Sequence, residues 1–551
     1  ANVLAFSFIG LLQQEIEING RSMINVVMES DAQQLSEVVV TAIGIEREKK
    51  ALGYSVASVD NEQIAQVSEP DPLRAVQGKL PGVSITGGGG APGQSTKINI
   101  RGSSSLTGNT QPLFVVDGIP FDNSTNAFDP DGGSTAIQNN SAFSNRAFDL
   151  DPNNIESMTV LKGAAAAALY GSRATNGVVI ITTKAAKKNS KKGLEVTYNG
   201  SYNVEQVSNL PDYQNVYSQG SNQLYNAGFI GNWGAPFPEH VDRLNQEYGT
   251  NYSQIIFPGT TDDAGNQIAP ATPAGFIPHP LVMTSVGRAQ GYDLLFPQFV
   301  KGYDTDGQFV TDPNNPLWGT GTPVGVDVPF QPYDIVGGFF DQGQVIENSI
   351  NITSGGEKSS LTGSVSNMSN QGIVPNSSAG RTSLSFGGNG QLDNGLFLSG
   401  NVTYVNTTQE APQSGGSFFG DYTDATSSSL FQRLYYLPRN YNLNGYPFES
   451  PIDGSNVFYR ALDNPRWIAK YNRFSSDVNR VYGNITLSYD IGEWLNLTAK
   501  GGVNSYHDQR EDIVRGGGVG LPAGRIFTED INYSEQDYNI IATVTKDINE
   551  S

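Results

Sequence analysis

The sequence predicts a mainly β protein, with a series of antiparallel strands after about residue 188 and a small α+β domain before them. Segments of about ten residues alternate between apolar and Ser, Thr or Asn side chains, which is the period of a strand with two different faces. Charged residues make up only 16% of the 551 residues, against roughly 25% in an average soluble domain. The longest apolar runs, such as 177–181, are far shorter than the roughly 18 residues of a membrane helix. Short alternating strands cross membranes without such a run, so a membrane β-barrel and a soluble β protein both fit these observations.

The composition excludes several kinds of function. Asp and Glu number 54 against 33 Lys and Arg, and the net charge of −21 repels phosphate and argues against nucleic acid as a partner. The absence of Cys excludes disulfides, thiolate metal sites and a Cys nucleophile. His240, His279 and His507 are far apart in the sequence, so a histidine-based metal or catalytic centre is poorly supplied. The sequence therefore offers little for a Cys- or His-based catalytic centre.

The first thirty residues are typical of two β-strands. Val3–Ile9 and Glu15–Val27 are β-prone, and Asn19-Gly20 is typical of a tight hairpin turn within the second segment. About thirty residues are too few to bury a core of their own, and the chain opens at Ala1 with neither an initiator Met nor a signal peptide. We expect residues 1–31 to be the end of a small β-sandwich domain.

A short β-prone run follows between polar linkers and consists of Glu37, Val38, Val39, Val40 and Thr41. Its composition allows two interpretations. It is either another strand of the preceding sandwich or a strand that pairs with an exposed sheet edge on another protein.

Residues 51–187 predict a compact α+β domain. Asp71–Gly78 is typical of a short helix with Pro72 near its first position, and Asp117-Gly118 is a strong hairpin signal. The four glycines at 87–90 lack the Lys-Ser/Thr of a phosphate-binding loop. The predicted strands are Val83–Thr86, Lys97–Arg101, Pro112–Ile119, Ile155–Leu161 and Gly177–Thr183.

We predict no cofactor. Two Asp-rich segments, 129–132 and 304–307, resemble fragments of calcium-binding loops. Neither has the full series of oxygen ligands that ends in Glu, so solvated turns are the preferred interpretation and bound calcium is the alternative.

From Gly193 onward the alternation becomes regular, and it predicts about eight strands. Stretches at about 206–344, 407–478 and 508–533 are instead irregular and rich in aromatic residues. Long loops of this kind fit the extracellular side of an outer-membrane barrel, while a soluble β-sandwich or β-propeller shows the same alternation. The alternating segments are Leu194–Glu205, Ile346–Ile352, Leu361–Asn367, Thr382–Phe386, Leu396–Tyr404, Val481–Tyr489, Leu495–Val503 and Tyr538–Val544.

Four ordered blocks point to a family. They are LRAVQGKLPGVSITGGGGAPG at 73–93, INIRGSSSL at 98–106, PLFVVDGIP at 112–120 and IESMTVLKGAAAAALYGSRATNGVVIITTK at 155–184. Together they resemble the plug domain of SusC/RagA-like TonB-dependent outer-membrane transporters. LSEVVVTAIG at 35–44 is similar to the TonB box of that family, which favours the strand-offering interpretation of Glu37–Thr41.

The resemblance implies a fold and a location. It implies a transmembrane antiparallel β-barrel of about 22 strands in the bacterial outer membrane, with the plug inside. The implied domains are the end of a carboxypeptidase-regulatory-like domain at 1–31, the TonB box and linker at 32–50, the plug at 51–187 and the first part of the barrel at 188–551. Eight strands leave no room for a plug of about 140 residues, so we expect the chain to be the front part of a longer protein.

The resemblance also implies roles and partners, and from it we predict no catalytic residues and no enzyme activity. TonB, energised by its ExbB–ExbD complex, would pair with Glu37–Thr41, and Arg101 and Arg173 would contact the barrel from the plug. A SusD-like surface lipoprotein would cap the barrel and deliver a glycan or peptide for import. Residues expected to face the substrate or this partner are Ser103, Asn109, Trp233, Phe237, Phe339, Phe340, Phe418 and Phe419; packing of the aromatic residues among the loops is the alternative.

Two other functions remain open at this point. One is a non-transporting member of the family that acts as a structural or assembly subunit of an outer-membrane complex. The other is a secreted β-rich protein that binds or hydrolyses carbohydrate, for which paired carboxylates in a cleft would be needed.

Overall fold

The computed structural model describes the large sheet, most of the plug and much of the loops. The predictions for the Asp-rich segments at 129–132 and 304–307 lie outside the described residues. The described residues are 3–8, 11–17, 26, 38–40, 46–48, 56–65, 69–87, 90–102, 110–125, 144–162, 170–184, 193–226, 229, 231–252, 255–257, 260–261, 267–269, 272–273, 275–283, 327–412, 430–450, 453–458, 462–492, 494–519 and 521–545.

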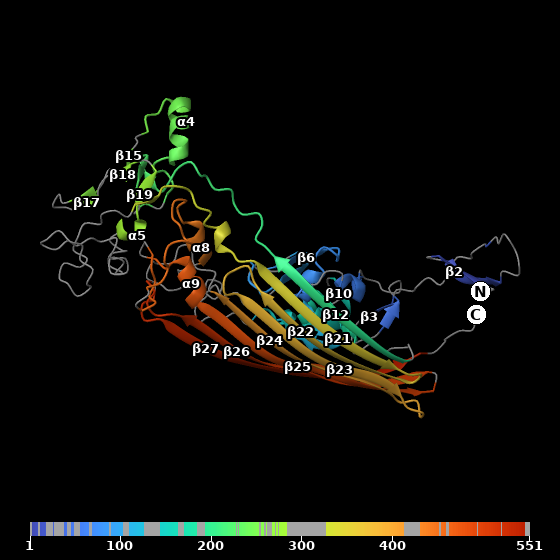
Figure 1. The fold of residues 1–551 in the computed structure, drawn as a ribbon. Helices are drawn as coiled ribbons and strands as arrows, with labels where there is room; N and C mark the ends of the chain where they lie inside the picture. Colours follow the sequence, from blue (N-terminus) through green and yellow to red (C-terminus); the bar gives the residue numbers. More distant parts are fainter. Residues whose placement is uncertain are drawn as a thin grey trace.

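An eight-stranded antiparallel sheet dominates the molecule (Figure 1). Each strand pairs with the next along the chain, so the sheet is a meander, and its two outermost strands pair on one side only among the described residues. The mainly β, antiparallel architecture is therefore confirmed, as an open sheet and not a closed barrel. The strands are β12 (Gly193–Glu205), β21 (Gly343–Gly355), β22 (Ser359–Gln371), β23 (Ser378–Gln391), β24 (Phe397–Pro412), β25 (Arg473–Ile491), β26 (Leu495–Val514) and β27 (Arg525–Val544).

The two faces of this sheet differ in chemistry. The outer face exposes apolar side chains at every second position, as in β12, where Leu194 is 71% exposed and Val196 61%. The inner face carries Ser, Thr, Asn and charged side chains, many of them buried against the plug. An apolar band outside and a polar face inside are the signature of strands that cross an outer membrane. Among the described residues, no helix is long and apolar enough to span a membrane.

Several strands are longer than their alternation predicts. The stretch at 508–533 was expected to be irregular, but most of it forms the ends of β26 and β27, in register from Leu495↔Val544 to Val514↔Arg525. Part of 407–478 is likewise strand, because β24 runs to Pro412 and β25 begins at Arg473. At these ends polar residues occupy both faces, so the apolar alternation disappears while the backbone pairing continues.

The two ends of the sheet have different connections. Short turns join β21 to β22 at 356–358, β23 to β24 at 392–396 and β25 to β26 at 492–494. The opposite end carries the long segments 206–342 and 413–472. Short turns on one side and long loops on the other match the periplasmic and extracellular sides of outer-membrane barrels.

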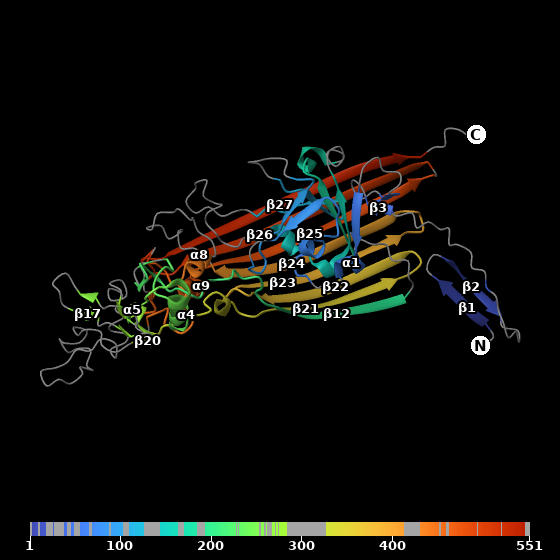
Figure 2. The same cartoon turned by 90° about the horizontal axis from the view of Figure 1, so that it is seen from above.

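The plug domain lies against the inner face of the sheet (Figure 2). Its sheet has the order β5-β10-β11-β8-β9, in which β11 and β8 are parallel and the other pairs antiparallel. A separate hairpin pairs β6 with β7. The plug strands are β5 (Val56–Asp60), β6 (Val83–Thr86), β7 (Lys97–Ile100), β8 (Leu113–Val116), β9 (Ile119–Phe121), β10 (Ile155–Leu161) and β11 (Val178–Thr183).

Short helices connect these strands. The helix expected after Asp71 is confirmed as α2 (Pro72–Ala75): the Asp71 carboxylate caps it by accepting the Leu73 N–H. The Asp117-Gly118 hairpin is also confirmed, with φ of 48° and 80° at its two turn residues. The other plug helices are α1 (Asn61–Ala65) and the 3₁₀ turns η3 (Arg146–Asp149), η4 (Pro152–Asn154) and η5 (Gly171–Ala174).

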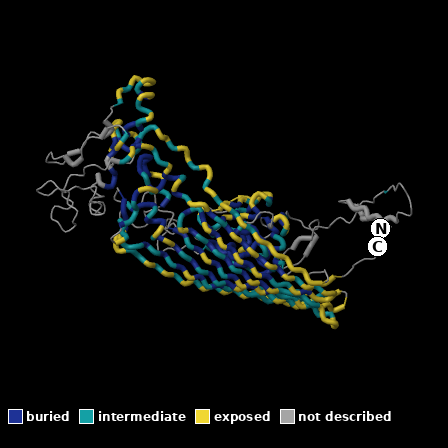
Figure 3. Tube along the Cα trace, viewed as in Figure 1, coloured by how far each residue is buried: buried dark blue, intermediate teal, exposed yellow. Residues whose placement is uncertain are grey.

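The plug core continues into the large sheet. Buried plug residues such as Ile98, Phe114 and Val179 form one apolar cluster that also contains Val405 of β24 and Tyr482 of β25. Burial is accordingly densest where the plug meets the inner face (Figure 3).

The long loops gather at one end of the sheet and form a module with its own core (Figure 1). We call this set, 206–283, 327–342, 430–458 and 462–472, the loop module. Trp467 is fully buried in it and donates its indole N–H to the Gly454 carbonyl. Its helices are α4 (Pro238–Tyr248), α5 (Pro280–Met283), α8 (Leu430–Tyr435), α9 (Pro465–Tyr471) and η7 (Gly337–Phe339); its strands are β13 (Gly220–Ser221), β14 (Leu224–Tyr225), β15 (Ile255–Phe257), β16 (Thr260–Thr261), β17 (Gln267–Ala269), β18 (Thr272–Pro273), β19 (Phe276–Pro278) and β20 (Asp327–Pro329).

Two short hairpins precede the plug. β1 (Val3–Phe8) pairs with β2 (Leu11–Glu17), and β3 (Val38–Val40) pairs with β4 (Glu46–Glu48). The first pair is in register from Val3↔Glu17 to Phe8↔Leu11, and the Asn19-Gly20 signal lies outside the described residues. The alternation of Val3–Phe8 predicts a strand, but it does not identify the strand with which Val3–Phe8 pairs.

Candidate plug–barrel interface

The functional residues of the plug meet the large sheet through a buried polar interface. The turns η3 and η4 present Arg146, Asp149 and Asp151 to the inner face, where Arg381 of β23 and Arg480 of β25 lie. Each of these five side chains is no more than 2% exposed. Charges buried this deeply are tolerated only when they are paired and hydrogen-bonded.

Arg480 joins the plug and the sheet most extensively. Its Nη1 lies 3.0 Å from Asp149 Oδ2, and its Nε and Nη2 donate to Asn504 Oδ1 at 3.0 and 2.8 Å. The guanidinium also lies 3.4 Å from the centroid of the Phe121 ring, which is cation–π geometry. One barrel side chain therefore contacts η3 and β9 of the plug together.

Arg146 extends this network to a second strand. Its Nη1 lies 3.8 Å from Asp149 Oδ1 and 3.7 Å from Asp508 Oδ2 of β26. Asp508 in turn accepts from Arg510 Nη2 at 2.8 Å. The result is an alternating row of buried cations and anions that crosses from the plug to the barrel wall.

Arg381 forms a second junction beside η4. Its Nη1 donates to the carbonyls of Pro70 at 2.8 Å and Phe148 at 3.1 Å, and its Nη2 lies 3.7 Å from Asp151 Oδ1. Nη2 also lies 3.4 Å from Glu347 Oε1 of β21. Because Arg381 holds both backbone and carboxylate groups of the plug, it fixes the orientation of η4 on the wall.

The β8–β9 turn is a third junction. The Asp117 carboxylate accepts the Thr183 N–H at 2.8 Å and Asn401 Nδ2 at 2.5 Å, and Lys500 Nζ donates to the Asp117 carbonyl at 2.5 Å. Burial raises the pKa of the Asp117 carboxyl, although these hydrogen bonds oppose the shift. The Thr183 hydroxyl also donates to this carboxylate at 2.7 Å. Amide groups and a hydroxyl therefore hold Asp117, with no close ion pair to it among the described residues.

Of the two arginines predicted to contact the barrel, one lies against it. Arg173 Nη1 is 2.7 Å from Glu535 Oε1 of β27, and the pair is half exposed on the arginine side. Arg101 has an exposed side chain, and no ion pair to it occurs among the described residues. Arg101 directly follows β7 of the β6–β7 hairpin and has a φ of 60°.

The predicted TonB box lies on a strand next to the short-turn end of the sheet (Figures 1 and 2). Val38, Val39 and Val40 form β3, paired in register with Glu48, Arg47 and Glu46. Glu37 and Thr41 lie outside the described residues.

The aromatic residues predicted to face a substrate or partner divide into two groups. Phe237 and Phe339 are fully or nearly fully buried in the loop module, so that prediction is wrong for them: Phe237 packs 4.9 Å from the Phe330 ring and Phe339 5.6 Å from Phe340. Phe340 is partly buried, whereas Trp233 is 69% exposed. Ser103, Asn109, Phe418 and Phe419 lie outside the described residues.

Sequence analysis missed the central residues of the interface. Arg381 and Arg480 each occupy an inner-face position on strands that also carry polar inner residues, such as Ser383 on β23 and Ser476 on β25. A lone arginine on the polar side of an alternating strand was the available signal. The partners of these two arginines, Asp149 and Asp151, belong to 3₁₀ turns, which show no alternation of apolar and polar residues. Among the described residues, no group of three His, Asp or Glu side chains could bind a metal ion.

Comparisons with known proteins agree with this geometry. The family model described as TonB-dependent Receptor Plug Domain matches residues 48–178. TonB-dependent receptor P39 of Formosa agariphila is 37% identical over 214 residues, 39% of this chain and 18% of the relative. TonB-dependent receptor SusC of Bacteroides thetaiotaomicron is 33% identical over 249 residues, 45% of this chain and 22% of the relative.

A solved structure shows the same fold. The RagAB peptide importer in its open-open state superposes with a TM-score of 0.60 at 19% identity, covering 93% of this chain and 47% of that one. The matches to the two curated relatives thus span about a fifth of their length, and the chain spans just under half of the solved protein.

Proposed function

Because this chain is a SusC/RagA-like TonB-dependent receptor of the bacterial outer membrane, we propose that it imports a nutrient in a TonB-dependent cycle. The observation that carries the proposal is the plug, docked on the inner face of the membrane sheet through Arg480–Asp149 and Arg381–Asp151. A plug held there would block free diffusion through a complete barrel. Import makes and breaks no bond in the substrate, so no residue is assigned a catalytic role.

The polar character of the interface suits a plug that must move. A dry apolar interface would lose about 25 cal/mol for every Å² exposed to water. Charged and amide groups such as those of Asp149, Arg480 and Asn504 can instead exchange protein partners for water as the plug shifts. The interface is therefore stable at rest and able to open under force.

The TonB box supplies the point where force would act. β3 pairs with β4 along one edge, and its other edge has no partner strand among the described residues. TonB would add a strand to that edge through main-chain hydrogen bonds. Tension on β3 would pass through the chain into the plug, beginning at β5, and draw the plug away from β24–β26.

We propose a glycan or a peptide as the cargo and a SusD-like lipoprotein as the partner at the loop module. Support comes from the likeness to SusC and to the RagAB peptide importer. Exposed aromatic side chains of the loop module, Trp233 and Tyr248, are suited to stacking on sugars or packing against a protein.

The test compares Val39→Pro with Val39→Thr in cells. Proline removes the backbone donor of residue 39, whereas threonine keeps it in a residue of similar shape. We expect Val39→Pro to abolish protonophore-sensitive uptake of fluorescent oligosaccharides and oligopeptides while the protein remains in the outer membrane. Val39→Thr should retain uptake. Equal uptake by the proline variant and the parent protein would overturn the assignment of the TonB box.

A further inference from the structure

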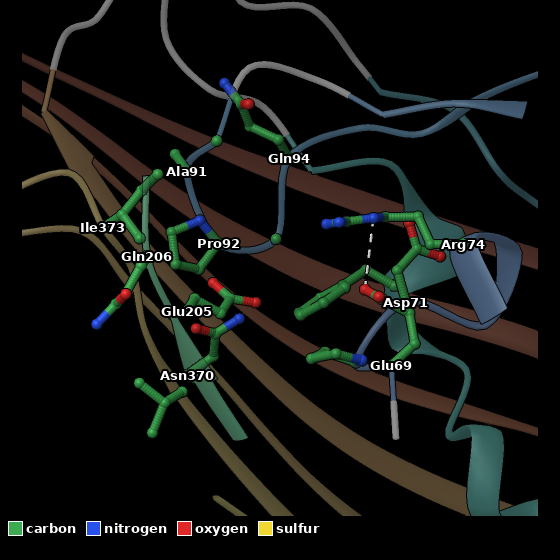
Figure 4. Close-up of a pocket in the computed structure, with 15 residues that line it drawn as sticks. Glu69, Asp71, Arg74, Ala91, Pro92, Gln94, Glu205, Gln206, Asn370 and Ile373 are labelled. Carbon is green, nitrogen blue, oxygen red and sulfur yellow. Dashed lines mark ion pairs between the residues drawn. The ribbon is translucent and has the colours of Figure 1, made fainter. Parts of the chain in front are cut away.

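A cavity of about 440 Å³ lies between the plug and the loop end of β12 and β22. This volume falls in the range of about 300–1,000 Å³ typical of small-molecule sites. Figure 4 shows Glu69, Asp71 and Arg74 of the plug on one side, Gln206, Asn370 and Ile373 on the other, and Glu205 and Pro92 between them.

The plug wall of the cavity is held in place by close contacts with the sheet. Pro92 packs so closely against Gly372 that a Cβ at this glycine would overlap both Pro92 and the Ser377 hydroxyl. The Pro92 carbonyl accepts Gln409 Nε2 of β24 at 2.9 Å. The cavity therefore forms when the plug is docked, at the end of the sheet that carries the long loops.

The charge of the cavity is negative. Glu69, Asp71 and Glu205 line it with a single cation, Arg74, among its lining residues. Arg74 Nε lies 3.4 Å from Glu69 Oε1, so this cation is paired with Glu69. Asp71 accepts the Leu73 N–H and the Thr96 hydroxyl, which occupies both its oxygens. Glu205 has no ion pair among the described residues and remains available.

A buried amide points to a ligand independently of these charges. Asn370 is 6% exposed and lines the cavity, yet its Oδ1 has no hydrogen-bond partner. The Oε1 of Gln94, on the opposite wall, is likewise buried and unpartnered. Buried polar atoms are nearly always satisfied in folded proteins. An open amide acceptor and an unpaired carboxylate that line the same cavity favour a donor-rich, positively charged group.

We propose that this cavity is a binding subsite for a primary ammonium group of the imported ligand, held by the Glu205 carboxylate and the amide oxygen of Asn370. The subsite rests on the proposed import function, because it lies at the loop end of β12 and β22, where an imported ligand would arrive from outside. Pro92, Phe148 and Ile373 provide an apolar wall for the carbon skeleton beside that group.

The raised pKa of Glu69 agrees with a cavity whose negative charge is not neutralised. Burial raises the pKa of the Glu69 carboxyl, Arg74 opposes the shift, and the charges of Asp71 and Glu205 raise the pKa further. A bound ammonium group would relieve this repulsion. A metal ion is a poorer occupant, since no metal-binding set of carboxylates occurs among the described residues.

The test uses two matched pairs of probes on the full protein purified in detergent. Trilysine is compared with acetylated trialanine amide, and the glucosamine trimer with the N-acetylglucosamine trimer, by isothermal titration calorimetry. We expect an ammonium-bearing probe to bind and its neutral match not to bind. Binding by trilysine alone indicates a peptide source of the ammonium group, and binding by the glucosamine trimer alone indicates an amino sugar.

The matched variants are Glu205→Gln and Glu195→Gln. Both remove one inner-face carboxylate of β12, but Glu195 lies at the short-turn end, away from the cavity. We expect Glu205→Gln to weaken binding about tenfold, or about 1.4 kcal/mol, and Glu195→Gln to change it less than twofold. Equal effects of the two variants, equal binding of neutral probes, or no binding of either ammonium probe would overturn the proposal.

This outcome is separable from that of the transport proposal. Binding in detergent requires no TonB, so the cavity is tested even if Val39→Pro leaves uptake intact. In cells, Val39→Pro should stop uptake of every cargo, whereas Glu205→Gln should reduce only the uptake of ammonium-bearing probes.

Discussion

Removing the Arg480 guanidinium should loosen the plug while leaving the sheet folded. Arg480→Met keeps much of the aliphatic stem but removes the 3.0 Å contact with Asp149 and two hydrogen bonds to Asn504. Asp149 would then be a fully buried carboxylate whose one remaining charged partner in the described part of the chain is Arg146, at 3.8 Å.

The expected cost follows from these contacts. Breaking one partner of a buried ion pair costs about 3–5 kcal/mol. Arg146 remains as a second, more distant partner, so we expect about 3 kcal/mol, the lower end. This raises the population of undocked plug about 100-fold, since each 1.4 kcal/mol is a factor of ten.

Hydrogen exchange of β8, β9 and η3, followed by mass spectrometry on detergent-solubilised protein, measures this population. A double-mutant cycle with Asp149→Asn isolates the pair, and we expect a coupling energy above about 1 kcal/mol. Arg173→Gln is the control, because its pair with Glu535 also joins plug and sheet but is solvent-exposed; it should cost under about 1 kcal/mol. Additive effects within about 0.5 kcal/mol, or equal losses for Arg480 and Arg173, would refute the reasoning.

Two further perturbations test the plug and the loop module. Gly177→Ala should destabilise the plug by about 3 kcal/mol, because Gly177 has φ of 95° and a Cβ there would lie 2.7 Å from Ile100 Cδ1. Gly171→Ala is the control, since Gly171 has φ of 71° but no atom within 4 Å of its Cβ. It should cost only about 1 kcal/mol in the same exchange experiment. In the loop module, burial lowers the pKa of His279 from 6.5 to about 4. As the pH falls from 7 to 4, the unfolded form therefore takes up a proton before the folded form does, and the free energy of unfolding should fall by up to about 3 kcal/mol. Tryptophan fluorescence melting should show this loss, and His279→Gln should flatten the pH dependence; an unchanged slope in that variant would assign the effect to other groups.

Much of the architecture could be predicted because it depends on local patterns. The two-residue alternation located all eight strands of the large sheet, since outer-face residues such as Val196 and Ile485 must be apolar whatever they contact. The Asp117-Gly118 turn and the Asp71 cap were equally local. Strand ends were missed where both faces become polar, as between Asp508 and Asp530, because no apolar face remains there to produce a period.

The interface could not be predicted, because it depends on distance in space. Asp149 and Arg480 are 331 positions apart, and nothing in either neighbourhood identifies the other. The loop aromatics show the same limit: Phe237 and Trp233 are four residues apart with similar surroundings in the sequence, yet one is fully buried and the other 69% exposed.

The sequence by itself determined that the chain forms alternating membrane strands and a plug, since the solvent on each side of a strand selects the side chains that face it. The tertiary structure alone decided which charges meet. Pairing of buried charges depends on how the plug is seated against β23, β25 and β26, and a periodic pattern carries no information about that seating. The cavity beside Glu205 has the same origin, because its walls come from the plug, from β12 and from β22, which come together only when the plug is docked.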